Sequence, residues 1–379
     1  MDIKTKCIHG KNALSDATGA VSYPIYQSAT FAHPGVGQST GYDYSRMQNP
    51  TREQLERTVA SLDGALDALA FSSGMAAIAA AFELFAPGSH IIVSDDLYGG
   101  AHRYFEHISK KNGLTFDYVN TSYIEQIADA LKPETKAVFV ETPTNPMMQV
   151  SDIRAICSLA KQHNLLTIID NTFLTPYFQQ PIALGADIVV YSGTKFYGGH
   201  NDVIAGFLVV NTQELSEKLR FILKTTGAGL APFDSWLILR GLKTLAVRME
   251  QQQKNALIIA NWLRTQPKVK RVFYAGLADH PSYAISLGQS TGFGSMISFE
   301  VESEETAVRI LERVQLILYA ESLGGVETLI TYPMLQTHAD IPKEIRESRG
   351  INGRLLRLSV GLEYADDLIA DLQQALEDK

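Results

Sequence analysis

The chain has 379 residues, of which 41 are acidic and 33 are basic, so its formal net charge at neutral pH is −8. Hydrophobic residues make up 45% and charged residues 20%, a composition typical of globular proteins that bury a large core. The acidic balance, without any run rich in lysine and arginine, argues against a nucleic-acid or anionic-membrane partner.

The cysteine content and the start of the chain favour an intracellular setting. Cys7 and Cys157 are the two cysteines, too few for a disulfide framework in a chain of this length, which favours a reducing compartment. The first residues carry an acid and lead into no apolar h-region, so we expect no signal peptide. No apolar run reaches the ~18 residues that span a bilayer. These features predict a cytoplasmic protein.

Residues 1–50 show no sustained periodicity and are rich in glycine, proline, aromatic and hydroxyl residues. Aromatic residues such as Tyr23, Tyr26 and Phe31 need a surface to pack on, so we expect an ordered arm rather than a disordered tail. We expect this arm to contact a neighbouring subunit.

Residues 51–235 alternate between short β-rich runs and helical patterns, which predicts a mostly parallel sheet with helices on both faces. The predicted strands are 91–93, 136–140, 166–170, 187–191 and 205–210. The apolar stretch 65–86 is interrupted by Asp67 and Glu83, and we interpret it as a buried helix with an approach loop.

The pattern changes in residues 236–379, which we interpret as a smaller α+β domain. This region begins with a long helical stretch at 236–263 and closes with an amphipathic helix at about 366–376. Strands are predicted between them at 295–301 and 355–360.

The segment Ser192–His200 places a lysine among small and hydroxyl residues, directly after a predicted strand. An isolated lysine at a strand end is usually a surface residue. Here, however, Ser192 and Thr194 can donate hydrogen bonds to a phosphate or a ring oxygen, and the glycines permit close backbone approach. Lys195 is therefore a candidate for covalent attachment of pyridoxal phosphate (PLP) through a Schiff base.

Asp170 ends the predicted strand 166–170, next to the strand that leads into Lys195. It could be a simple turn cap. Its carboxylate could also keep the nitrogen of a pyridine ring protonated, so that the ring withdraws electrons. An aspartate and a lysine at the ends of neighbouring strands form a pair that can hold PLP.

Two further features suit a phosphate. The turn around Ser73–Gly74–Met75 opens an alanine-rich helix whose first N–H groups and dipole favour an anion, although such turns also serve as plain helix caps. Arg46, assisted by Tyr44, could clamp a phosphate if the arm crosses to a neighbouring subunit.

Tyr98 and Arg357 are candidates for the ring and the substrate. Tyr98 lies between acids and glycines in a loop after a strand, where it has room to stack on a planar ring or to serve structurally. Arg357 alternates with apolar residues along a strand, and an inward-facing arginine there needs an anion such as a substrate carboxylate. The histidine spacings indicate no metal site, since the closest pair, His102 and His107, suits an exposed helix.

Over nearly its whole length the chain resembles the PLP-dependent enzymes of cysteine and methionine metabolism, which include cystathionine γ-synthase, cystathionine γ-lyase, cystathionine β-lyase and methionine γ-lyase. The matching segments are Tyr44–Arg46, Asn49–Thr51, Ser73–Met75, Tyr98–Gly100, Glu141–Pro146, Asp170–Thr172, Ser192–His200, Glu321–Gly325 and Arg357–Ser359. So many motifs in one order are specific for the family and much less specific for the member.

The resemblance implies a type I PLP-dependent aminotransferase-like fold and a homotetramer built from two catalytic dimers. It implies that Lys195 forms the Schiff base and that Tyr98 stacks on the ring and shuttles a proton. The implied cofactor-binding residues are Gly74, Met75, Tyr98, Asp170, Ser192, Thr194 and Lys195, with Tyr44 and Arg46 from the adjacent subunit. The implied substrate-binding residues are Asn145, Glu321, Ser322 and Arg357.

Two positions bear on which family member the chain is similar to. Methionine γ-lyases generally have a cysteine two positions after the stacking tyrosine, where this chain has Gly100. Members that act on cystathionine by γ-chemistry have an acid at the position of Glu321. We therefore expect a lyase that cleaves cystathionine or a related sulfur amino acid by β- or γ-elimination. Cystathionine γ-synthase stays open as the alternative, ahead of methionine γ-lyase, an aminotransferase or a PLP-binding protein without turnover.

Overall fold

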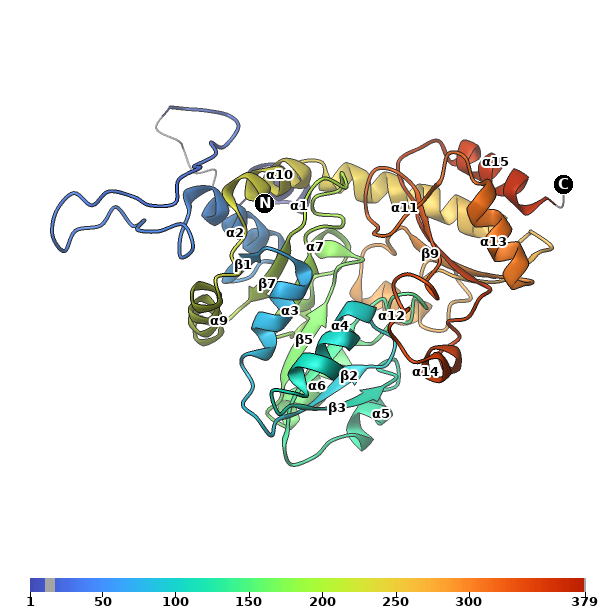
Figure 1. Ribbon diagram of the computed structural model, residues 1–379, viewed down its shortest axis with the longest axis horizontal. Helices are drawn as coiled ribbons and strands as arrows, with labels where there is room; N and C mark the ends of the chain where they lie inside the picture. Colours follow the sequence, from blue (N-terminus) through green and yellow to red (C-terminus); the bar gives the residue numbers. More distant parts are fainter. Residues whose placement is uncertain (11–17, 378–379) are drawn as a thin grey trace.

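The structure is a computed structural model that describes residues 1–10 and 18–377. A seven-stranded sheet forms the centre of its larger part (Figure 1). In spatial order its strands are β1 (Asp67–Phe71), β7 (Gly206–Val210), β6 (Ile188–Ser192), β5 (Leu166–Asp170), β4 (Thr135–Glu141), β2 (His90–Ser94) and β3 (Thr115–Val119). Within this sheet β7 alone runs antiparallel to its neighbours. The prediction of a mostly parallel sheet is confirmed.

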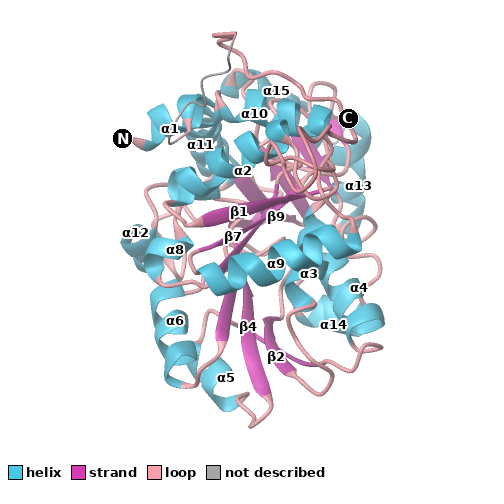
Figure 2. Ribbon diagram, turned by 90° about the vertical axis from the view of Figure 1, so that its left-hand side faces the viewer, coloured by secondary structure: helices cyan, strands magenta, loops and turns pink. Residues whose placement is uncertain are grey.

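Alternate residues of each strand enter cores on opposite faces of the sheet. On β4, Val138 and Val140 join one core, whereas Ala137 and Phe139 join the other. Helices therefore cover both faces (Figure 2). Those on the first face are α2 (Pro50–Asp63), α6 (Ile153–Gln162), α8 (Pro181–Leu184) and α10 (Pro232–Leu242), and those on the second are α3 (Gly74–Phe82), α4 (Gly99–Tyr104) and α9 (Gln213–Thr226). Shorter pieces are η1 (Phe105–Ser109), α5 (Ile124–Asp129) and α7 (Thr175–Phe178).

The expectation of a helix with an approach loop at 65–86 is wrong for its first part. Residues 67–71 form β1, which pairs with β7 along its whole length, and the helix α3 begins only at Gly74. A fully buried strand and a buried helix both have short apolar runs, so local periodicity does not distinguish them. The edge strand β3 was not predicted either, because Asp117 interrupts its apolar pattern.

A second sheet organises the C-terminal part, where helices and mostly antiparallel strands occur together. Its strands in spatial order are β10 (Leu318–Tyr319), β11 (Leu329–Thr331), β12 (Leu355–Ser359), β9 (Met296–Val301) and β8 (Val269–Phe273). All neighbours are antiparallel except β10 and β11. The helices α11 (Leu245–Leu263), α13 (Glu304–Arg313) and α15 (Ala365–Leu376) share a core with this sheet, and α12 (Tyr283–Gln289) and α14 (Lys343–Ser348) complete the region.

The helical stretch predicted at 236–263 is two helices, α10 and α11. The carbonyl of Gly241 accepts hydrogen bonds from Thr244 and from the guanidinium of Arg248, which ends α10. The predicted boundary between residues 235 and 236 consequently lies inside α10. The division into an arm, a large domain and a small domain remains a prediction.

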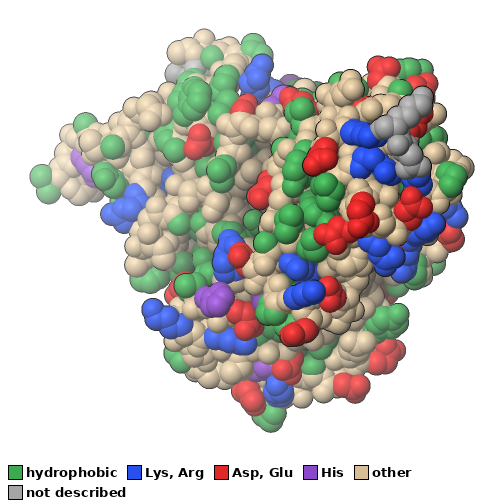
Figure 3. All heavy atoms as spheres, turned by 45° about the vertical axis from the view of Figure 1, so that its right-hand side comes forward, with side chains coloured by type: hydrophobic (Ala, Val, Ile, Leu, Met, Phe, Trp, Pro, Cys, Tyr) green, Lys and Arg blue, Asp and Glu red, His purple; other side chains and the backbone are tan. Residues whose placement is uncertain are grey.

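The N-terminal segment projects from the body of the molecule in Figure 1 and carries exposed hydrophobic side chains, which are visible in Figure 3. It begins with α1 (Ile3–His9), and most of residues 18–48 have no regular structure. Val21 and Val36 are almost completely exposed. Residues 11–17 of the predicted arm lie outside the described residues.

None of the helices in the described part of the chain is both long and apolar enough to cross a bilayer. Over the same residues, no group of three or more His, Cys, Asp or Glu side chains gathers as metal ligands would.

Candidate active site

A cavity of about 280 Å³ lies where β4, β5 and β6 end and a loop of the C-terminal region meets them. This is the carboxyl edge of the large sheet, the usual place for a ligand in an α/β fold. The cavity brings together every predicted site residue except Tyr44 and Arg46. These residues are Gly74, Met75, Tyr98, Asn145, Asp170, Ser192, Thr194, Lys195, Glu321, Ser322 and Arg357.

Lys195 lies in a tight turn directly after β6. Its N–H donates to the carbonyl of Ser192 at 3.1 Å, and its own carbonyl accepts from Gly199 at 2.8 Å. The buried guanidinium of Arg248, from α11, donates to the carbonyl of Phe196 at 2.7 Å and fixes the far side of the turn. The backbone under Lys195 is therefore held from both sides, which limits where its side chain can reach.

The amine of Lys195 points across the cavity and donates to Oγ of Ser322 at 2.9 Å. Burial, together with the positive charge of Arg357, lowers its pKa to about 8, and Glu321 opposes both effects. A lysine with such a pKa is partly neutral near neutral pH. It can therefore act as a nucleophile toward an aldehyde or as a base.

Asp170 and Glu141 are register partners at the ends of the parallel strands β5 and β4. Oδ1 of Asp170 accepts the N–H of Thr172 at 3.0 Å and its hydroxyl at 2.6 Å. Burial raises the pKa of Asp170 to about 6, while the bonds from Thr172 oppose that rise. A cationic ring nitrogen beside Asp170 would stabilise its ionised form.

Glu141 lines the same cavity, and sequence analysis gave it no role. Its carboxylate accepts the N–H of Tyr98 at 2.9 Å and the N–H of Asn145 at 2.9 Å, so it joins two segments that carry predicted site residues. Burial, and then the charge of Asp170, raise its pKa well above the usual range. The signal was available, because Glu141 directly follows the predicted strand 136–140, at the same edge of the sheet as Asp170.

We expect Glu141→Gln to lower the free energy of unfolding by about 1–3 kcal/mol, because an amide has one acceptor oxygen and would leave one buried N–H unsatisfied. Urea unfolding of the cofactor-free protein measures this change. Glu125→Gln, on the surface helix α5, is the matched control and should change stability by less than about 0.5 kcal/mol. Equal stability of the two variants would contradict the bridging role of Glu141.

The start of α3 forms a small cradle. Oγ of Ser73 caps the helix by accepting the N–H of Ala76 at 3.0 Å. A Cβ at Gly74 would lie 3.1 Å from Oγ of Ser192, so glycine keeps this space open. Since the first N–H groups of a helix have no partner within the helix, the cradle suits a phosphate flanked by hydroxyl donors.

The ring of Tyr98 is held at the mouth of the cavity by the glycines that follow it. A Cβ at Gly100 would lie 2.4 Å from this ring, and one at Gly99 would lie 2.0 Å from the carbonyl of Thr337. Tyr98 is 41% exposed and lines the cavity, so one face of its ring is available for stacking.

Arg357 is fully buried on β12 and faces the cavity. It donates to Oδ1 of Asn145 at 2.7 Å, to the carbonyl of Ser322 at 3.1 Å and to Oγ1 of Thr331 at 3.1 Å. Its Nε has no hydrogen-bond partner among the described residues, and burial lowers its pKa to about 10. A buried cation with a free donor is a natural receptor for a substrate carboxylate.

The loop that contains Ser322 has a strained backbone. Ser322 has a φ of 87°, a left-handed value that residues with a Cβ rarely adopt. Gly324, at a φ of 80°, packs so closely that a Cβ would lie 2.8 Å from the backbone nitrogen of Phe196. This conformation lets the loop direct the Ser322 hydroxyl at Lys195 and its carbonyl at Arg357.

Tyr44 and Arg46 lie away from the cavity of their own chain. Arg46 donates to the carbonyl of Lys224 at 2.6 Å, and its guanidinium lies 5.5 Å from the centre of the Tyr44 ring. Both side chains are exposed. Their predicted contribution to the site of an adjacent subunit remains a prediction.

These residues fit a planar aldehyde that carries a phosphate and a basic ring nitrogen. A partly neutral lysine, a buried carboxylate, a hydroxyl-flanked helix start and a half-exposed aromatic ring all line one cavity. This set of side chains suits an organic cofactor.

Comparison with known proteins identifies the family. Residues 4–377 match the family described as Cys/Met metabolism PLP-dependent enzyme. The chain is 50% identical over 377 residues to cystathionine beta-lyase of Lactococcus lactis subsp. cremoris (strain MG1363), with 100% of this chain and 99% of the relative covered. It is 49% identical to cystathionine gamma-synthase/O-acetylhomoserine (thiol)-lyase of Bacillus subtilis (strain 168), with 99% and 96% covered.

A solved structure, cystathionine gamma-lyase from Lactobacillus plantarum complexed with L-serine, superposes with a TM-score of 0.96 at 46% identity and covers 99% of this chain and 98% of that one. The type I PLP-enzyme fold is thereby confirmed. The chain belongs to the Cys/Met-metabolism family of PLP-dependent enzymes, and PLP is its cofactor.

Proposed function

We propose that this enzyme cleaves a carbon–sulfur bond of cystathionine by elimination. The proposal rests on one cavity that contains both a buried arginine, Arg357, and an exposed acid, Glu321. Both lie close enough to Lys195 to affect its pKa. Arg357 suits the α-carboxylate of an amino acid, and Glu321 suits a second, distant ammonium group. Cystathionine carries both groups. Relatives named for cystathionine at about half identity support the same substrate.

The chain's own residues account for the proton transfers. Arg357 and Asn145 hold the carboxylate, which places the Cα–H bond near the amine of Lys195. When bound, PLP supplies a ring that stabilises the charge left on Cα as this bond breaks. Lys195 takes the proton, assisted by its contact with the hydroxyl of Ser322, and Tyr98 is placed to protonate the departing sulfur.

The position of the cleaved bond distinguishes two outcomes. Elimination at Cβ converts cystathionine and water to homocysteine, pyruvate and ammonia. Elimination at Cγ gives cysteine, 2-oxobutyrate and ammonia, and it needs a second proton removed from Cβ. Product analysis with cystathionine as the sole substrate tests the proposal, and formation of neither keto acid would end it.

Cystathionine γ-synthase is the second candidate. The 49% identity to a Bacillus subtilis relative with that name favours it. The same cavity would then replace the acyloxy group on Cγ of an O-acyl-homoserine with the sulfur of cysteine, and the acyloxy group would leave as a carboxylate. Incubation with an O-acyl-homoserine and cysteine distinguishes the synthase from the lyase, because a synthase forms cystathionine faster than it consumes it.

Glu321→Gln should raise KM for cystathionine about fivefold, because one exposed charge pair with the distal ammonium is lost, worth about 1 kcal/mol. The internal control is a substrate that lacks that ammonium: cysteine if the enzyme eliminates at Cβ, and homocysteine if it eliminates at Cγ. Its kcat/KM should change by less than about twofold. Steady-state kinetics with both compounds measure the difference. If both substrates lost activity equally, Glu321 would have a general role rather than one in specificity.

We infer a catalytic dimer, within a cytoplasmic homotetramer, in which the arm completes the site of the neighbouring subunit. The arm projects from the body, and Arg46 lies outside the cavity of its own chain. Arg46 is tied to the rest of the chain by Arg52, which donates to the carbonyl of Ser45 at 2.8 Å and to that of Arg46 at 3.4 Å. The segment therefore has a defined conformation to present to a partner.

This assembly predicts complementation between two inactive variants. Lys195→Ala and Arg46→Ala, unfolded together and refolded, form hybrid dimers in which one site has both residues intact. About a quarter of the wild-type activity should return in an equal mixture. Mixing without unfolding is the control. A mixture that stays inactive after refolding would place Arg46 outside the neighbouring site.

A further inference from the structure

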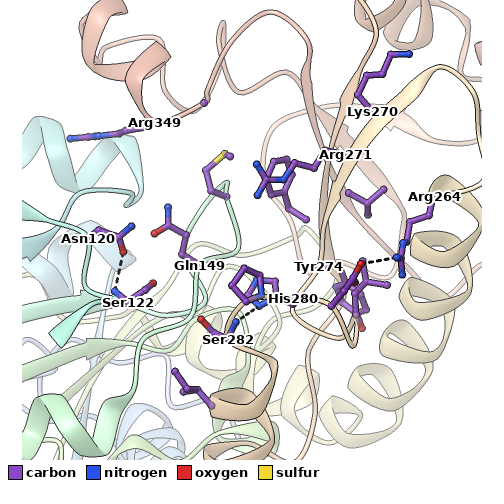
Figure 4. Close-up of a pocket in the computed structure, with 18 of the residues that line it drawn as sticks. Asn120, Ser122, Gln149, Arg264, Lys270, Arg271, Tyr274, His280, Ser282 and Arg349 are labelled. Carbon is purple, nitrogen blue, oxygen red and sulfur yellow. Dashed lines mark hydrogen bonds and ion pairs between the residues drawn. The ribbon is translucent and has the colours of Figure 1, made fainter. Parts of the chain in front are cut away.

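A second and larger cavity, about 840 Å³, forms a groove between the two parts of the chain (Figure 4). One wall comes from the large sheet's side, including Asn120, Ser122 and Gln149. The other comes from β8 and the segment after it, and from Arg349 behind α14. The groove shares no lining residue with the candidate active site. Its volume falls within the range of small-molecule sites.

The charge of the groove is opposite to that of the chain. Four cationic side chains and one acid line it, although the protein as a whole has a net charge of −8. The acid, Asp279, is paired with Arg264 at 2.7 Å. Asp95 and Asp96 lie near enough to raise the pKa of Arg349 against the effect of its burial. In the described part of the chain neither Lys270 nor Arg271 forms a salt bridge, so these two side chains carry the uncompensated positive charge of the groove.

Arg271 is oriented by its neighbours. Its guanidinium lies 4.5 Å from the centre of the Phe273 ring, and Figure 4 draws its side chain among the residues that line the groove. A guanidinium that rests on an aromatic face keeps its edge of N–H donors free. Such an edge binds phosphate or carboxylate with two parallel hydrogen bonds.

The rest of the lining defines the ligand more closely. Neutral amides at Asn120 and Gln149 can complete the hydrogen bonding, while apolar side chains provide contact area for a compact body. The apolar residues are Met147, Val272, Leu277 and Ile285. We propose that this groove is a binding site for a small polyanion, carrying phosphate or carboxylate groups, that is not the substrate.

A short loop connects this groove to the active site. In the loop 144–149, Asn145 lines the active site, whereas Met147 and Gln149 line the groove. The N–H of Thr144 donates to the carbonyl of Gln149 at 2.9 Å, and the N–H of Gln149 returns a bond to Oγ1 of Thr144 at 2.9 Å. The two faces therefore belong to one closed hydrogen-bonded unit.

Side chains from the C-terminal region hold three carbonyls of this loop. His338 donates to that of Asn145 at 3.1 Å, Ser298 to that of Pro146 at 2.6 Å and His280 to that of Met148 at 3.0 Å. His280 also accepts the N–H of Ser282, which fixes its neutral tautomer. An anion in the groove contacts both this loop and β8, so its binding acts on Asn145 and hence on KM.

The experiment uses PLP-loaded enzyme, so that the phosphate site of the cofactor is filled. Inorganic phosphate, pyrophosphate and citrate are titrated by calorimetry at constant ionic strength. We expect saturable binding of at least one, and we expect Lys270→Gln/Arg271→Gln to weaken it at least about tenfold, the loss of two charge-assisted contacts. Arg154→Gln/Lys161→Gln, on the exposed face of α6, removes equal charge and should leave binding unchanged.

Activity provides the second readout. The anion that binds should change KM for cystathionine in the wild type and in the α6 variant. It should not change KM in Lys270→Gln/Arg271→Gln. Without anion, the activity of Lys270→Gln/Arg271→Gln should stay at the wild-type level. No saturable binding of any of the three anions would overturn the proposal. Equal binding of an anion to both double variants would also overturn it. The same holds if the anion inhibits purely competitively and still does so in Lys270→Gln/Arg271→Gln.

Discussion

Replacing Lys195 with alanine is expected to lower turnover of cystathionine by more than about 10⁴-fold, because the change removes both the covalent attachment point and the base. The visible absorption band of bound PLP should shift to that of the free aldehyde. Steady-state kinetics measure the loss of turnover, and an absorption spectrum of the same sample measures the shift of the band.

Lys161→Ala is the matched control, since this lysine is exposed on α6 and does not line the cavity. It should retain wild-type turnover and the wild-type spectrum. The stability of Lys195→Ala should not fall, because burial and Arg357 already disfavour the charged amine. A Lys195→Ala protein that kept turnover and spectrum would refute the assignment of this residue.

Replacing Asp170 with asparagine is expected to lower kcat about 10²–10³-fold and to weaken PLP binding. Asparagine keeps an oxygen that can accept both bonds from Thr172, so the local fold is preserved. The loss is that of one negative charge beside the ring nitrogen. Equilibrium titration with PLP and steady-state kinetics of the loaded enzyme measure the two effects.

The pH dependence distinguishes this role from a purely structural one. In the cofactor-free protein the pKa of Asp170 is raised to about 6, so the carboxylate is ionised above that pH and protonated below it. Affinity for PLP should therefore fall as pH decreases through about 6, by roughly tenfold per unit at the lower end. The asparagine variant should lack this step, and a step of equal size in both proteins would exclude Asp170 as its origin.

Much of the fold could be predicted because its signals are local. Strands such as β4 and β5 are short runs of β-branched residues buried on both faces, and they alternate with helical patterns. Elements defined by distant contacts were not predicted correctly. β1 is a strand because it pairs with β7, over a hundred residues away, and the end of α10 depends on Arg248 in the next helix.

The site could be predicted to a similar extent. Lys195 and Asp170 stand out because each follows a strand, and parallel strands bring their carboxyl ends to one edge. Arg248 acts through a backbone carbonyl of another segment, so it has no local signal of its role. The groove beside β8 joins residues from 120 to 350, and only the folded chain shows that their charges gather.

The most direct test of the central claim is chemical mapping of the cofactor attachment site. PLP-loaded enzyme is reduced with borohydride, digested and analysed by mass spectrometry. The reduced pyridoxyl group should be found on Lys195 alone. The fraction of activity that is lost should equal the fraction of Lys195 that carries the group. A pyridoxyl group on any other lysine, with Lys195 unmodified, would contradict the account.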